Sequence, residues 1–142
     1  MNVNPPLPPF IKGGLGGFKQ ESMSNLEIKV ERQHFAGLPL ALITLKGIID
    51  TPSRPELDQT ITDLFSEHVY RFIFEASGLK VSGPTILDFF IRVGAMMKEK
   101  SGRVVVVNPN EHIRTAFELI GLEQYISIAD DIGGALKLFI ES

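Results

Sequence analysis

The chain has 142 residues, of which 44% are apolar and 22% charged, a balance typical of one globular domain with a short tail. It contains no cysteine, which excludes disulfides, thiolate metal sites and a cysteine nucleophile. The net charge of −3 and the lack of any Lys/Arg cluster argue against nucleic acid as a partner. No apolar run reaches the ~20 residues of a membrane span and the N-terminus lacks the pattern of a secretion signal, so we expect a cytoplasmic protein.

Residues 1–22 differ in composition from the rest of the chain. Prolines between positions 5 and 9 and glycines between 13 and 17 leave few side chains that could pack. We therefore expect a disordered tail, followed by one domain over residues 23–142. A polyproline ligand is one alternative for the tail. The stretch also resembles translated intergenic repeats of bacterial genomes, which would make Met23 the native start.

The first half of the domain has the pattern of a hairpin and a helix. Apolar residues alternate with charged ones from Leu26 to Val30, and a β-branched apolar run over residues 40–49 ends at Asp50. The turn residues 37–39 between them predict an antiparallel pair of strands. A helix follows residues 51–53, with one apolar face made of Leu57, Ile61, Leu64 and Phe65.

The second half alternates strands with helices. We expect strands over residues 69–74, 103–107 and 126–128, each followed by a helix, and these helices begin near Pro84, Asn108 and Asp131. Asn108 is the expected cap of its helix because Glu111 lies three residues on, and Gly121 is its expected end. Four residues of this helix are expected to face inward: Ile113, Ala116, Phe117 and Ile120. The order β-β-α-β-α-β-α-β-α predicts an α/β fold with a mixed sheet and an antiparallel N-terminal hairpin.

Residues suited to catalysis do not converge anywhere in the sequence. His34, His68 and His112 are spread over three elements without the spacing of metal ligands, so we expect no metal. No glycine-rich loop follows a strand, and no Gly-x-Ser-x-Gly elbow is present. We therefore expect no cofactor and no enzymatic activity.

The most informative segment runs from Glu75 to Phe90, from a strand through a loop into a helix. Free main-chain N–H groups and the dipole of a helix N-terminus favour an anion there. A phosphate on Ser82 or Thr85 would place about two negative charges on a docking surface and switch association. The alternative is structural: Ser82 caps the helix and Thr85 lies in its first turn.

The helix after this loop is apolar over an arc of roughly 220°, against the ~100° that a surface helix buries. Asp88 and Arg92, spaced for an ion pair, mark its solvent side. Phe89, Ile91 and Met96 lie at the border of the apolar arc. Either a neighbouring helix covers them or they form an exposed patch for a partner.

Three stretches of the sequence carry motifs. Leu45–Asp50 ends a strand with Gly-x-x-Asp, and Glu75–Leu79 reads Glu-Ala-Ser-Gly-Leu. Asn108–Leu122 combines a capped helix with a Gly-Leu ending, and the strand 126–128 follows it. Together these motifs resemble the STAS domain, the family of bacterial anti-sigma factor antagonists, over the whole chain beyond the tail.

The resemblance implies a STAS-like fold and a non-catalytic module that binds an anti-sigma factor or serine kinase of the GHKL type. In that family a Ser or Thr at the start of the second helix is phosphorylated. Aligned without gaps, the family motif Asp-Ser-Ser-Gly falls on residues 83–86, so Pro84 replaces the usual phosphoserine and Thr85 matches the second serine. A one-residue slip places Ser82 at the acidic position. The candidates are therefore Thr85 and Ser82 for phosphorylation, and, for partner binding, Asp50, Ser82, Gly83, Pro84, Thr85, Phe89 and Met96.

Two other functions are compatible with the sequence. The wide apolar arc could line a pocket in a ligand- or lipid-handling accessory module of a transport system, because STAS domains also occur with such systems. A small α/β enzyme is the third alternative, although no acid, base or nucleophile can be named for it.

Overall fold

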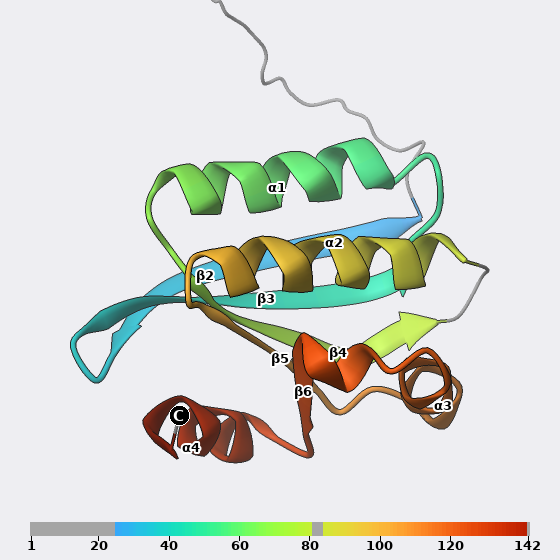
Figure 1. The fold of residues 1–142 in the computed structure, drawn as a ribbon. Coiled ribbons are helices and arrows are strands. Elements are labelled where there is room, and N and C mark those ends of the chain that lie inside the picture. Colours follow the sequence, from blue (N-terminus) through green and yellow to red (C-terminus); the bar gives the residue numbers. More distant parts are fainter. Residues whose placement is uncertain (1–24, 81–83, 142) are drawn as a thin grey trace, which may run out of the picture.

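The computed structural model describes residues 25–80 and 84–141, without the side chain of Glu141. The expected tail over residues 1–22 lies outside the described residues. The elements in chain order are β2 (Leu26–Phe35), β3 (Leu38–Ile48), α1 (Arg54–Ser66), β4 (Arg71–Lys80), α2 (Thr85–Glu99), β5 (Arg103–Val107), α3 (Glu111–Leu119), the 3-10 helix η2 (Leu122–Gln124), β6 (Ile126–Ala129) and α4 (Ile132–Glu141) (Figure 1).

The strands form one sheet in the order β2-β3-β4-β5-β6. β2 and β3 are antiparallel, and every later pair is parallel because a helix returns the chain to the same end of the sheet each time. The prediction of a mixed α/β sheet with an antiparallel N-terminal hairpin is confirmed.

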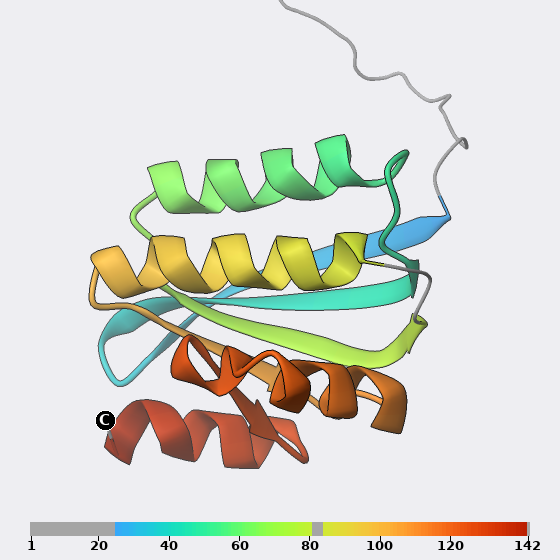
Figure 2. The same ribbon diagram turned by 45° about the vertical axis from the view of Figure 1, so that its right-hand side comes forward.

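Helices cover both faces of the sheet. α1 and α2 lie side by side over one face, and α4 lies on the opposite face (Figure 2). A chain of edge-to-face phenylalanines joins β4, α2 and α3 in the core of the first face. The ring centroids are 5.3 Å apart both for Phe74–Phe90 and for Phe90–Phe117. Such pairs add about 0.5–1.5 kcal/mol beyond the burial of apolar area, so they fix α2 and α3 relative to the sheet.

Three local predictions are wrong. Asn110, not Asn108, caps α3: its side chain accepts a 2.9 Å hydrogen bond from the N–H of Ile113. Asn108 instead turns the chain with a φ of 57°. Ile120 is 45% exposed because α3 ends one residue before it, at Leu119. β4 runs to Lys80 rather than ending at residue 74, since β3 continues to pair with it beyond an irregularity near Thr44.

Candidate functional site

Three of the predicted site residues, Asp50, Pro84 and Thr85, lie at one edge of the sheet. Strands β3 to β6 are parallel, so their carboxyl ends meet at this edge, and α1, α2 and α3 begin there (right side of Figure 1). Ligands and partners of open α/β sheets characteristically bind at such an edge. We call it the carboxyl edge and define it by residues 50–54, 84–88 and 108–111.

Asp50 holds the turn between β3 and α1. Its Oδ1 accepts a 3.1 Å hydrogen bond from the N–H of Ser53, and its own N–H donates to Oγ of Ser53 at 2.9 Å. Partial burial on its own would raise the pKa of the Asp50 carboxyl, but the hydrogen bonds from Ser53 and Asn25 outweigh it and lower this pKa below its ordinary value. The half-buried carboxylate therefore serves first to fix the start of α1.

Gly47 explains why the Gly-x-x-Asp motif needs its glycine. Its φ is +112°, a conformation that other residues rarely adopt, and a Cβ there would collide with the main-chain oxygen of Asn25. The close approach allows that oxygen to accept a 3.0 Å hydrogen bond from the N–H of Ile48. It also brings the Asn25 amide within 3.5 Å of the Asp50 carboxylate. The motif thus builds the turn rather than an open ligand site.

Arg54 connects α1 to α2. Its Nε donates to Asp58 at 3.2 Å and its Nη1 to Asp88 at 3.0 Å. The arginine side chain is only 16% exposed, and its guanidinium lies 5.7 Å from the ring centroid of Phe89. Asp88 also forms an ion pair with Nε of Arg92 at 3.4 Å, so the predicted ion pair between these two residues is confirmed. Arg54 therefore closes the seam between the two helices with a small charge network.

Thr85 lies at the start of α2, in a shallow hollow of about 460 Å³ between α1 and α2. The hollow is lined by Thr51, Arg54, Pro84, Thr85 and Asp88. Thr85 is half-buried and Pro84 is exposed. The first helical hydrogen bond runs from the N–H of Asp88 to the carbonyl of Pro84 at 3.1 Å, so the N–H groups of residues 85–87 have no acceptor within the helix. These donors and Arg54 make the hollow favourable for an added negative charge.

Ser82 and Gly83, which were also predicted for this surface, lie outside the described residues. Of the other predicted partner-binding residues, Asp50, Pro84 and Thr85 belong to the carboxyl edge. Met96 is half-buried against the core, on α2 but eleven residues from Thr85, which at the helical rise is about 16 Å along the axis. Its partner-binding role stays a prediction, apart from the hollow.

The prediction that Phe89 contacts a partner is wrong. Phe89 is 0% exposed, because α1 covers the flank of α2 and the ring packs edge-to-face on Phe74 and Phe90, 5.8 and 5.1 Å away. The other border residues divide: Ile91 is 40% exposed, and Met96 is half-buried. The wide apolar arc of α2 is thus mostly core, which removes the reason for expecting it to line a ligand pocket.

Arg54 was missed in the sequence. Its i,i+4 spacing to Asp58 was a usable signal, whereas its partner Asp88 is 34 residues away and could not be found without the fold. Within the part of the chain that the structure describes, no three His, Cys, Asp or Glu side chains gather as metal ligands. In the same part, no helix is long and apolar enough to cross a membrane.

A family model described as the STAS domain matches residues 28–135, most of the chain. The chain belongs to this family. Its fold resembles the crystal structure of an anti-sigma factor antagonist from Mycobacterium paratuberculosis at a TM-score of 0.59 and 19% identity, over 79% of this chain and 93% of that one. It also resembles the anti-sigma factor antagonist SpoIIAA in its unphosphorylated form, with a TM-score of 0.63 and 16% identity over 80% and 98% of the two chains.

A third similar structure is the phosphorylated form of SpoIIAA, described as a Bacillus cell fate determinant. Its TM-score is 0.59, with 18% identity over 74% of this chain and 93% of that one. A search of curated proteins found no match. At these identities the structures establish the STAS fold, and the geometry of the carboxyl edge has to carry the argument for function.

Proposed function

We propose that this STAS domain is a non-catalytic regulatory module that binds a protein partner, an anti-sigma factor or serine kinase of the GHKL type, through its carboxyl edge. The observation that carries the proposal is the hollow around Thr85, where a half-buried residue with a hydroxyl, N–H groups without an acceptor inside α2, and Arg54 lie on an accessible surface. Two of the similar structures are a phosphorylated and an unphosphorylated form of an antagonist, which supports a regulated surface as the function of such a fold.

The switch that we propose is phosphorylation of Thr85. A phosphate there would add about two negative charges three residues before Asp88 on the same helix. Arg54, which pairs with Asp88 at 3.0 Å, lines the same hollow, and the phosphate would compete with Asp88 for it. Arginine binds phosphate with a bidentate fork. The modified protein would therefore redirect Arg54, weaken its link to Asp88 and change both the charge and the shape of the docking surface.

Ser82, which lies outside the described residues, is the second candidate for the modification. Thr85→Val separates the two, because valine keeps the shape of threonine and removes only the hydroxyl. We expect the wild-type chain to gain one phosphate when it is incubated with ATP and a GHKL-type kinase from its own host. The phosphate should map to Thr85 by mass spectrometry of the peptides.

Thr85→Val should abolish this modification, while a Ser82→Ala control should retain it. Modification of Ser82 in both the wild type and Thr85→Val would move the switch to the loop. If neither residue is modified by any such kinase of the host, phosphorylation is not the means of regulation.

A further inference from the structure

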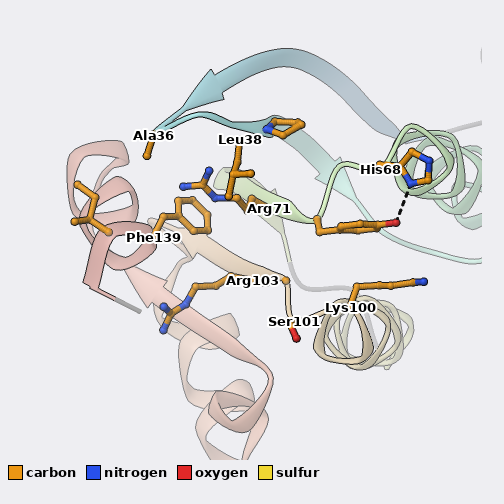
Figure 3. Close-up of a pocket in the computed structure, with 12 residues that line it drawn as sticks. Ala36, Leu38, His68, Arg71, Lys100, Ser101, Arg103 and Phe139 are labelled. Carbon is orange, nitrogen blue, oxygen red and sulfur yellow. Dashed lines mark hydrogen bonds between the residues drawn. The ribbon is translucent and has the colours of Figure 1, made fainter.

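A second pocket lies at the opposite end of the strands from the carboxyl edge. It has a volume of about 510 Å³ and forms where the β2–β3 turn, the first residues of β4 and β5, and the end of α4 meet (Figure 3). We call it the amino-edge pocket. Its lining consists of Ala36, Leu38, Pro39, His68, Tyr70, Arg71, Lys100, Ser101, Gly102, Arg103, Phe139 and Ile140.

The charged residues of this pocket are all cations. Arg71, Lys100 and Arg103 line it together with His68, and none of its lining residues is acidic. Among the side chains that the structure describes, no carboxylate forms an ion pair with any of the three cations. Every other arginine between residues 25 and 141 does have a carboxylate partner: Arg32, Arg54, Arg92 and Arg114. The two arginines without a carboxylate partner among the described side chains therefore both line this pocket.

Arg71 is the anchor of the pocket because it is buried to nine-tenths, at 9% exposure. Its Nη1 donates a 2.6 Å hydrogen bond to the main-chain oxygen of Phe35, and its guanidinium lies 4.8 Å from the ring centroid of Phe139. A guanidinium carries five N–H donors, of which this arrangement uses one. Burial lowers the pKa of Arg71 from its ordinary value. A buried charge is costly unless an opposite charge and further hydrogen bonds compensate it.

The surroundings of Arg71 are apolar enough to hold the body of a ligand. Leu38 and Phe139 flank the guanidinium in Figure 3, and Pro39, Tyr70 and Ile140 complete the apolar lining. Arg103 is positioned by a 2.8 Å hydrogen bond from its Nη1 to the carbonyl of Leu138. Lys100 is exposed, with its ammonium 6.0 Å from the ring centroid of Tyr70. The pocket thus combines one buried, fixed cation, two further cations and an apolar lining.

We propose that the amino-edge pocket binds a small organic anion, a carboxylate or a phosphate monoester attached to an apolar body. Arg71 would supply the buried donors for the oxyanion, Arg103 and Lys100 would add positive potential at the rim, and the apolar body would lie against Leu38, Pro39 and Phe139. Arginine suits either head group because its planar fork matches both carboxylate and phosphate oxygens. This site shares no residue with the carboxyl edge, so the test of this proposal is independent of the test of the proposed function.

The test uses three probes of similar size: benzoate, phenyl phosphate and the neutral benzyl alcohol. Binding to the full chain is measured by calorimetry and by the shifts of backbone and arginine side-chain N–H signals in NMR spectra. We expect at least one of the two anions to bind, its affinity to fall as salt rises, and the signals of Arg71 to move first. Benzyl alcohol should bind more weakly by about tenfold or more.

Two double variants separate a local site from the overall charge of the protein. Lys100→Gln with Arg103→Gln removes the two rim cations and should weaken anion binding about tenfold. Lys29→Gln with Arg92→Gln removes the same charge from exposed residues outside the pocket and should leave the affinity within about twofold. Equal losses in both double variants, equal binding of the alcohol, or no binding of either anion at millimolar concentration would overturn the proposal.

Discussion

Charged side chains at the two ends of the parallel strands have different kinds of partner. At the carboxyl edge Asp50 is held by hydrogen bonds from Ser53, and Arg54 is paired with Asp58 and Asp88. At the amino-edge pocket Arg71 and Arg103 donate to main-chain carbonyls, and the guanidinium of Arg71 lies over the ring of Phe139. At the first edge the cation Arg54 is already paired, and an added negative charge would compete for it. The second retains positive charge that a ligand could neutralise.

This difference in charge pairing indicates which roles the charged residues have in this fold. A matched network such as that of Arg54 holds helices together, and in the proposed switch it would rearrange when a phosphate is added. A buried arginine without a described carboxylate, such as Arg71, is costly for stability unless something compensates it. Five substitutions test the difference between the two ends.

The largest effect is expected for Phe89→Ala, which tests whether the carboxyl edge rests on rigid core. Phe89 is fully buried against Phe74 and Phe90, so the truncation should lower the free energy of unfolding by about 3–5 kcal/mol. Ile91→Ala on the same helix, at a residue 40% exposed, should cost less than about 1 kcal/mol. Urea denaturation followed by circular dichroism measures both. Similar costs for the two variants would mean that Phe89 lies at the surface after all.

Gly47→Ala tests the built turn of the carboxyl edge. The positive φ alone costs on the order of 1–3 kcal/mol for a residue with a side chain, and the new Cβ would collide with the oxygen of Asn25. We expect a clear fall in the melting temperature. Gly133→Ala in α4 is the matched control, because the nearest atom to its added Cβ would be Oδ1 of Asp131, at an ordinary contact distance of 3.6 Å. If the control is destabilised as much as Gly47→Ala, the collision is not the cause.

Gly102→Ala applies the same change at the other end of the strands. The added Cβ would collide with the main-chain oxygen of Tyr70, beside the amino-edge pocket, although no positive φ adds strain. We expect a destabilisation smaller than that of Gly47→Ala and a loss of anion binding, because the pocket wall must move. Thermal unfolding and the binding of phenyl phosphate measure the two effects. An unchanged affinity in the folded variant would show that this wall does not shape the pocket.

Asp50→Asn tests the charge that fixes the turn. Because the pKa of Asp50 is lowered in the folded state, its ionised form stabilises the fold above the unfolded pKa of about 3.9. That contribution is lost as the pH falls through the lower, folded pKa. The variant should therefore lose less stability than the wild type between pH 7 and pH 3, as measured by urea denaturation at each pH. Identical acid sensitivity would remove Asp50 from the list of groups that stabilise the turn.

Arg54→Gln should have the smallest effect on stability, about 1 kcal/mol or less, because Asp58 and Asp88 are more than half exposed. A double-mutant cycle with Asp88→Asn isolates the bridge between α1 and α2. The proposed switch requires a coupling energy that is measurable but small, so that a phosphate on Thr85 can compete for Arg54. A coupling of several kcal/mol would make such a competition ineffective.

The sequence predicted the fold because its local signals agreed with one another. Alternation in β2, the four valines of β5 and the glycine at residue 121 each indicated the element that is present, with Gly121 at a φ of 70°. The errors arose where tertiary contacts decide. The pattern of α2 could not tell that α1 would cover Phe89. The spacing of Asn108 and Glu111 matched a capping box, although Asn110 is the residue that caps α3.

The site was only partly predictable for a related reason. Asp50 and Thr85 were found from motifs that are local in the chain. The role of Arg54 depends on its ion pair with Asp88, which lies on a different helix. The amino-edge pocket had no local signal at all. Arg71 begins β4 and Arg103 begins β5, and only the parallel register of these strands, in which the two residues pair, brings the arginines together.

The most direct test of the proposed function compares the two edges in binding one partner, a GHKL-type anti-sigma factor or kinase from the same host. Affinities are measured by calorimetry for the wild type, for Thr85→Glu at the carboxyl edge and for Lys100→Glu at the amino edge. We expect Thr85→Glu to weaken binding about tenfold or more, which corresponds to about 1.4 kcal/mol. Lys100→Glu should leave the affinity within about twofold. Full affinity in Thr85→Glu, with a loss confined to Lys100→Glu, would contradict the proposed function.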